Sequence, residues 1–183
     1  MQELTEVLPI LAENKFEIVP LELKHVPDVA RLAREYYSDG FQMSEDEIRS
    51  NLVDLEPGDQ NFCFALEDRD ELVGYLFGWV ANTLVEGVTE DVALLEDMVL
   101  ARKARGYVVQ MIWSMITEMN RHGLQGMPIE GAVRGLISRV FLRHDQVFRK
   151  RLGYFLAAIH EYHDDDIGED LVWVRFEAVR APG

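Results

Sequence analysis

The sequence is poor in cysteine and in long apolar runs. Its one cysteine, Cys63, stands between two phenylalanines, which excludes an internal disulfide and is typical of a small buried side chain. A lone cysteine fits the reducing cytoplasm. No uncharged run approaches the ~20 residues of a membrane-spanning helix, and the acidic stretch 1–15 is unlike a secretory signal. We therefore expect a cytoplasmic protein that does not associate with membranes.

Positive charge is also scarce, with 18 Lys and Arg against 33 Asp and Glu, a formal net charge of −15. A chain this acidic is not expected to bind nucleic acid. Ten of the basic residues nevertheless lie between Ala101 and Arg151, a stretch with only three acids. Either these residues gather around one anion site or they lie on separate helix surfaces, and the sequence leaves both interpretations open.

Several motifs of common enzyme classes are missing. The chain has no P-loop, no paired-cysteine zinc site and no recognisable Ser-His-Asp order. His160 and His163 precede an acidic run, Asp164 to Asp166, which could hold a cation. An acidic loop is more often a solvated turn, so we expect no metal site.

The length of 183 residues and the hydrophobic content of 48% predict one globular domain. We expect a lead-in at 1–15 and a single domain at 16–183. Periodicity predicts strands at 16–21, 61–66, 72–82, 93–100, 127–133, 154–162 and 171–179, with helices at 25–37, 44–55, between Gly106 and Gly123, and at 138–152. Thr83 to Val92 is interpreted as a polar linker. This order predicts a layered α/β (α+β) sheet.

The stretch 93–123 carries the most informative pattern. An apolar run, Ala93 to Leu100, is interrupted only by Glu96 and Asp97 and predicts a buried strand. A basic turn ending in Gly106 follows, and then the long helix. The first amides of a helix lack partners within the helix, so a strand, a basic turn and a helix N-terminus together predict a phosphate-binding site.

Leu95 to Val109 (LEDMVLARKARGYVV) resembles the acyl-CoA-binding segment of the GNAT acyltransferase superfamily, a central strand followed by [Arg/Gln]-x-x-Gly-x-[Gly/Ala] and a helix. The motif falls on Lys103 to Val108, and Gly106 matches its central glycine. Leu152-Gly153-Tyr154 resembles the Leu-Gly-Phe element of that family. The predicted element order is also that of the GNAT fold. The resemblance therefore implies a mixed, mostly antiparallel central sheet of six to seven strands with about four flanking helices.

The same resemblance implies an N-acetyltransferase that moves an acetyl group from acetyl-CoA to a primary amine. It places the carbonyl donor among the strand amides of Met98, Val99 and Leu100, and the pyrophosphate on the turn Lys103, Ala104, Arg105, Gly106, Tyr107 and Val108. The general base would be Glu96 or Asp97. Successive strand residues face opposite sides, so at most one of the two faces a given cleft, and the alternative is that one or both lie at a solvated sheet edge. The acidic surface favours a cationic acceptor, such as a polyamine or a Lys-rich peptide.

Two positions depart from the family pattern. Val108 stands where the family has Gly or Ala, and Arg149 stands where many members have a tyrosine that protonates the CoA thiolate. We expect Val108 to face the core, because it begins an i, i+4, i+7 series with Ile112 and Met115. We expect Gly106 to leave its amide uncovered, which a positive φ at glycine would allow.

The departures leave an alternative open. The chain would then be a catalytically inactive GNAT-fold protein, a binding or structural component of a larger assembly. A homo-oligomer or a protein partner is also left open.

Overall fold

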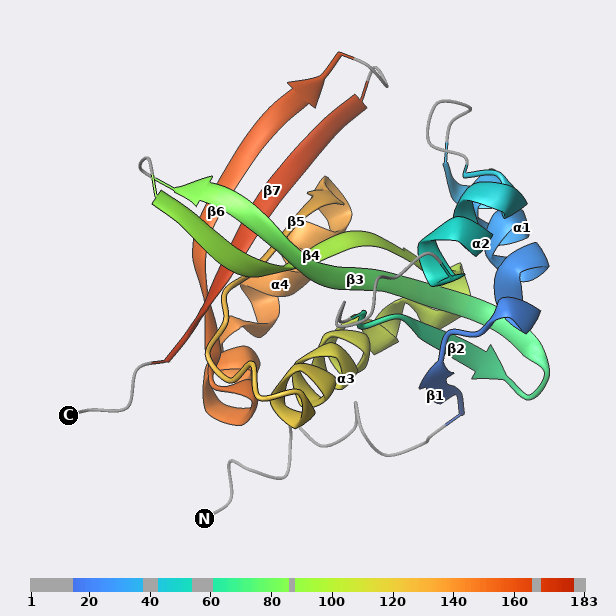
Figure 1. The fold of residues 1–183 in the computed structure, drawn as a ribbon, viewed down its shortest axis with the longest axis horizontal. Coiled ribbons are helices and arrows are strands. Elements are labelled where there is room, and N and C mark those ends of the chain that lie inside the picture. The colour runs from blue at the N-terminus through green and yellow to red at the C-terminus, as the bar shows by residue number, and fades with distance from the viewer. Residues whose placement is uncertain (1–14, 38–42, 54–60, 86–87, 166–168, 180–183) are drawn as a thin grey trace.

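The computed structural model describes residues 15–37, 43–53, 61–85, 88–165 and 169–179 (Figure 1), so nearly all of the predicted lead-in lies outside the described residues. The strands are β1 (Glu17–Pro20), β2 (Phe64–Asp68), β3 (Glu71–Val85), β4 (Val88–Leu100), β5 (Ile129–Arg134), β6 (Tyr154–Asp164) and β7 (Glu169–Ala178). The helices are α1 (Val26–Tyr36), α2 (Glu45–Val53), α3 (Val108–Arg121) and α4 (Gly135–Val147), with 3₁₀ turns η2 (Leu23–His25) and η4 (Arg102–Tyr107) and a π turn η5 (Phe148–Leu152).

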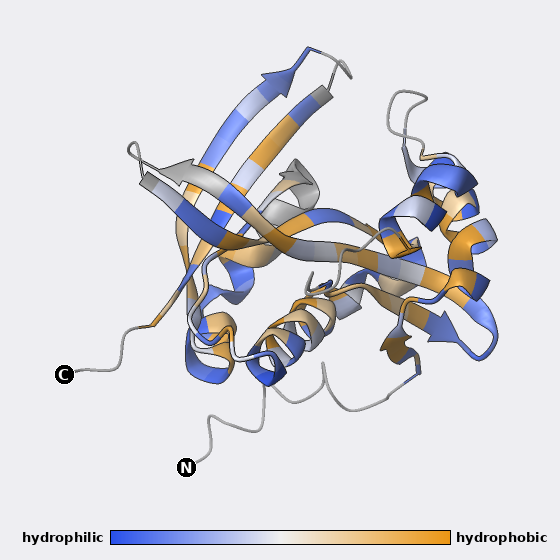
Figure 2. Cartoon of the chain, viewed as in Figure 1, coloured by the Kyte–Doolittle hydropathy of each residue, from blue (hydrophilic) through white to orange (hydrophobic). Residues whose placement is uncertain are grey.

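The seven strands form one sheet in the order β1-β2-β3-β4-β5-β7-β6. Neighbouring strands are antiparallel except for β4 and β5, which are parallel. The predicted fold class is therefore confirmed: a mixed, mostly antiparallel sheet with four flanking α-helices. The hairpin of β6 and β7 extends away from the helices (Figure 1), and Figure 2 shows hydrophilic residues over much of its outer half.

The prediction of a linker at Thr83 to Val92 is wrong. β3 continues to Val85 and β4 begins at Val88, with Thr83 opposite Glu90 in the antiparallel ladder. The prediction took the polar residues for a loop. Polar residues are also tolerated in antiparallel strands, because such strands can keep one face in water.

Local signals at other element ends are confirmed. The Ser44 amide donates to Glu47 Oε2 (2.6 Å) and the Glu47 amide donates to Ser44 Oγ (3.2 Å), the reciprocal capping box predicted for α2. Gly153 ends η5 with φ of 68°. The helix predicted to begin at Ser138 starts earlier, at Gly135.

The two faces of the sheet carry separate hydrophobic cores. On one face, α3 packs Met111, Met115 and Ile116 into a cluster with Leu76 and Leu95. The opposite face packs against α1 and α2, and its cluster is Leu21, Val26, Val29, Ala30, Leu32, Ile48, Cys63, Ala65, Leu72, Tyr75, Phe77 and Val99. Cys63 is thus buried, as predicted. Figure 1 shows α3 and the α1–α2 pair on opposite sides of β3.

The sheet opens along β4. The pairing of β4 with β5 covers three residues and ends where Leu95 lies opposite Gly131. At the same level the register between β3 and β4 shifts, because Gly78 lies opposite Leu95 but Phe77 lies opposite Asp97. The extra residue, Glu96, forms a β-bulge. Beyond Leu95, β4 therefore keeps its partner on the β3 side, and among the described strands none pairs with it on the β5 side.

We predict that Gly131→Ala destabilises the protein by about 1–3 kcal/mol. A Cβ at this position would lie 2.6 Å from the Leu95 carbonyl oxygen and 2.9 Å from Leu95 Cβ. Gly106→Ala is the control, since a Cβ there would meet nothing within 4 Å. Urea unfolding measures both, and equal stability of Gly131→Ala and the wild type would contradict the tight approach of β5 to β4.

Candidate active site

The proposed phosphate turn is η4, between β4 and α3. Gly106 is exposed with open space where its Cβ would be, and its φ is not positive. Val108 is only 3% exposed and belongs to the core beneath α3, as predicted. Its methyl groups therefore point away from the turn, and no acidic residue lies in the first turn of α3.

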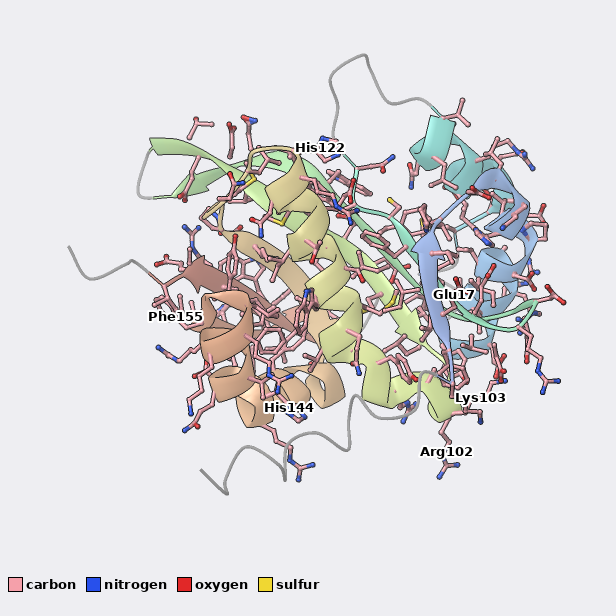
Figure 3. All side chains as sticks on the ribbon, turned by 90° about the horizontal axis from the view of Figure 1, so that it is seen from below. Glu17, Arg102, Lys103, His122, His144 and Phe155 are labelled. Atoms are coloured by element: carbon pink, nitrogen blue, oxygen red, sulfur yellow. The ribbon has the colours of Figure 1, made fainter. Side chains whose placement is uncertain are left out.

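The basic residues of the turn have different surroundings. Lys103 Nζ forms ion pairs with Asp68 Oδ2 (3.1 Å) and Glu71 Oε2 (2.9 Å), at the end of the β2–β3 hairpin. Its charge is therefore already met by two carboxylates. Arg102 and Arg105 are exposed. Figure 3 shows Arg102 and Lys103 together at one end of α3.

The candidate base Asp97 faces α1 and lies between two phenols. The hydroxyl of Tyr37, at the end of α1, donates to Asp97 Oδ1. The hydroxyl of Tyr75, on β3, donates to Oδ2 at 2.7 Å. Glu96 is exposed. The structure thus separates the two predicted acids: Asp97 is held inside the fold, and Glu96 projects from the bulge.

The pKa of Asp97 is raised from 3.8 to about 6, and the largest cause is burial, which disfavours the charged form. Hydrogen bonds from Tyr37, Tyr75 and the Met98 amide lower it, and the neighbouring Glu96 raises it. The pKa of Glu96 is also raised, by partial desolvation. A carboxyl group with a pKa of about 6 is mostly ionised at neutral pH but binds a proton readily, which suits a general base.

The backbone of β4 turns two amides toward the opening. The N–H of Ala101 donates to the Val73 carbonyl on β3, at 2.8 Å. Amide directions alternate along a strand, so the Val99 N–H also points to β3. The N–H groups of Met98 and Leu100 point the other way, to the side that β5 has left.

The bulge at Glu96 produces this arrangement. Before the bulge the N–H of Ala93 points toward β5 and donates to the Pro128 carbonyl at 2.8 Å. Without a bulge, the amides of all odd-numbered residues of β4 would point toward β5, as that of Ala93 does. The inserted residue changes the alternation, so even-numbered amides face the opening. It also keeps the side chain of Asp97 on the face where α1 lies.

Comparison with known proteins identifies the fold. No protein-family model and no curated protein matches the sequence. The ribosomal-protein-S18-alanine N-acetyltransferase from Escherichia coli matches in structure, with TM-score 0.58, 18% identity, and coverage of 91% of this chain and 96% of that chain. An acetyltransferase of the GNAT family from Streptococcus pneumoniae matches with TM-score 0.60, 12% identity, and coverage of 89% and 99%. This chain has the GNAT fold.

A further match limits what the fold implies. The GNAT-like decarboxylase GphF, solved in complex with isobutyryl-CoA, has TM-score 0.59 and 13% identity, covering 90% of this chain and 100% of its own. The GNAT fold therefore serves more than one reaction, and the chemistry of this chain has to be argued from its own residues.

Arg149, which stands where the resemblance implies a tyrosine, forms an ion pair. Arg149 Nε donates to Asp145 Oδ2 (2.6 Å), and its guanidinium lies 4.7 Å from the centre of the Phe155 ring. The hydroxyl of the nearby Tyr154 is buried and donates to the Met127 carbonyl, at 3.0 Å. Neither residue is placed as a proton donor to a thiolate.

A buried ion network, which the sequence analysis did not predict, lies on the same sheet face as Asp97. On β3, Phe77 lies opposite Asp97, and Trp79, two residues further along β3, lies opposite Leu94. On β5, Glu130 lies opposite Leu94. These side chains therefore share one face of the GNAT sheet. Glu130 is only 4% exposed.

Arg175, on β7, is the centre of this network. Its guanidinium binds Glu90, Glu130 and Glu177. Three carboxylates around one guanidinium leave the network negative. No local pattern predicts it, because its members lie on three strands and come together only through the register of the sheet.

The described residues contain no group of three His, Cys, Asp or Glu side chains arranged to hold a metal ion. His163 contacts Asp170 Oδ1 at 2.8 Å and Asp165 Oδ1 at 3.8 Å. Within the described part of the chain, no helix is long and apolar enough to span a membrane.

We predict that Asp97 makes stability depend on pH. Its pKa is raised only in the folded protein, so between about pH 4 and 6 the folded protein binds more protons than the unfolded chain. The contribution of Asp97 to stability therefore increases as pH falls through 6. From about pH 7.5 to 4.5 the wild type should gain on the order of 1–3 kcal/mol relative to Asp97→Asn, measured by urea unfolding.

The matched control is Asp91→Asn, which changes an exposed carboxylate on the same strand. A wild type that shows the same pH dependence relative to both variants would contradict a raised pKa at Asp97.

Proposed function

We propose that the protein is an N-acyltransferase that moves an acetyl group from acetyl-CoA to a primary amine. The observation that carries the proposal is that Asp97 and the outward-facing amide of Leu100 lie on the part of β4 that β5 has left. GNAT-fold proteins are known with acyl-CoA bound, as in the complex of GphF with isobutyryl-CoA. The reaction class is inferred from the residues of this chain.

The two substrates would approach from different sides. The turn η4 leads into α3, which packs on one face of the sheet, and Asp97 projects from the other face toward α1. The pyrophosphate would lie on the amides from Arg105 to Val109, with Arg105 adding charge. Because the pairing of β4 and β5 ends at Leu95, an acyl group could pass between the strands to meet an amine on the Asp97 side.

The chemistry follows from these positions. The amine nitrogen attacks the thioester carbonyl carbon, the C–N bond forms, and the C–S bond breaks. The N–H of Leu100 would donate to the carbonyl oxygen as negative charge develops there, since the N–H of Met98 is already bonded to Asp97. Asp97 accepts the proton lost by the amine, and the thiolate of CoA leaves and takes a proton from water. This sequence needs no tyrosine at the position of Arg149.

The charge of the acceptor face supports a cationic acceptor. The Arg175 network leaves a net negative charge on the face that also carries Asp97. Glu96 adds an exposed carboxylate beside the opening. The negative face would attract a polyamine or a lysine side chain more strongly than a neutral amine of similar size.

A second candidate is a GNAT-fold protein that binds without catalysis. The ion pair of Arg149 with Asp145, at the position of the thiolate acid, favours it. So does the engagement of Lys103 with two carboxylates. Such a protein would serve as a binding or structural component of a larger assembly.

The test uses acetyl-CoA and a panel of primary amines that includes spermidine, a lysine peptide and a neutral amine. We expect acetyl-CoA to raise the melting temperature of the protein, and CoA to be released with at least one cationic amine. Asp97→Asn should lower kcat/KM about 10²–10⁴-fold. Glu96→Gln should lower kcat/KM much less than Asp97→Asn, and Asp91→Asn, which changes an exposed carboxylate elsewhere on β4, is the matched control.

Three outcomes separate the candidates. Thermal stabilisation without CoA release would support the non-catalytic candidate. No stabilisation at millimolar acetyl-CoA would overturn CoA binding altogether. An effect of Glu96→Gln as large as that of Asp97→Asn would show that the base is wrongly assigned.

A further inference from the structure

Two consecutive tyrosines at the end of α1 reach two different parts of the candidate site. The hydroxyl oxygen of Tyr36 accepts the N–H of Arg102, the first residue of η4, at 3.2 Å. The hydroxyl of Tyr37 donates to Asp97. Tyr37 leaves the helix in an extended conformation (φ −109°, ψ 149°), and its amide still bonds the Ala33 carbonyl at 2.8 Å. This change of backbone direction sends neighbouring side chains to different targets.

A third tyrosine holds Asp97 from the inside. Tyr75 is fully buried, and its ring lies edge-on to that of Phe77, with 5.6 Å between centroids. Its hydroxyl donates to the carboxylate oxygen that Tyr37 does not bind. Each carboxylate oxygen of Asp97 therefore accepts one hydrogen bond from a phenol. The two phenols come from different parts of the fold, the end of α1 and β3. Neither the plane nor the direction of the carboxylate can change without breaking one of these bonds.

We propose that Tyr37 and Tyr75 are positioning residues for the acyl transfer proposed above, holding the carboxylate of Asp97 in one orientation on the sheet face that α1 covers. Tyr36, one residue earlier, bonds the amide of Arg102 in the phosphate turn and not Asp97. In this arrangement one helix end connects the turn for the cofactor with the base for the acceptor.

The choice of phenols has a physical reason. An arginine or lysine bonded to Asp97 would favour the charged carboxylate strongly and make it a weak base. A neutral phenol orients the carboxylate and offsets only part of the cost of burial. The groups that act on Asp97 are Tyr37 from α1, Tyr75 from β3, and Glu96 and the Met98 amide from β4. Within the described residues, none of these groups is a basic side chain.

The experiment measures the pKa of Asp97 directly, by following its side-chain ¹³C carboxyl signal against pH, with Asp97→Asn to assign the signal. Tyr37→Phe and Tyr75→Phe each remove one donor and keep the ring. We expect each to raise the pKa of Asp97 by about one unit. The acid limb of kcat/KM against pH should move upward by the same amount. Tyr36→Phe, the matched control, should leave the pKa of Asp97 unchanged.

The outcomes are decisive for the proposal on their own. A pKa of Asp97 that is unchanged or lowered in Tyr37→Phe overturns it, and Tyr37 is only partly buried, so this variant should fold. A shift of similar size in Tyr36→Phe would also overturn it, because the effect would then be general. If the protein releases no CoA with any amine, the proposed function fails, while the carboxyl titration still decides whether the phenols control Asp97.

Discussion

The candidate site depends on the short pairing between β4 and β5. Three residue pairs join these strands, and the pairing ends at Leu95 and Gly131. At that level Gly131 lies so close to Leu95 that a side chain has no room. One residue later the bulge at Glu96 changes which amides of β4 face β5. The close approach and the separation therefore follow each other within two residues, and together they leave strand amides without a β5 partner inside a continuous sheet.

The two faces of the sheet differ in chemistry. The face under α3 is apolar, and Val108 belongs to its core, so the N-terminus of α3 is packed against the sheet. The other face carries carboxylates. Two phenols donate hydrogen bonds to Asp97, and Arg175 forms ion pairs with three glutamates. Buried acids are costly unless hydrogen-bonded. Asp97 accepts from Tyr37 and Tyr75, and the buried Glu130 accepts from Arg175 on β7.

The sequence contains enough information for the fold and for the turn, because both rest on local patterns. The apolar stripe of α3, Gly106, and the strand that contains Asp97 are all visible in one stretch of sequence. The prediction of a linker at Thr83 to Val92 was wrong because solvent-facing strands and loops share a polar composition. The tyrosines around Asp97 could not be predicted, since Tyr37 lies sixty residues from it. The same holds for Lys103, whose partners Asp68 and Glu71 lie on another hairpin.

The most direct test of this account is an amide NMR titration of the ¹⁵N-labelled protein with a non-hydrolysable acetyl-CoA analogue. A ligand whose carbonyl lies between β4 and β5 and whose pyrophosphate lies on η4 should shift the amides of Met98 or Leu100 and of Arg105 to Val109 most strongly. The Val99 amide, which points to β3, should shift less than its two neighbours. Absence of shifts along 98–109, or the largest shifts on a part of the chain remote from β4 and η4, would contradict it.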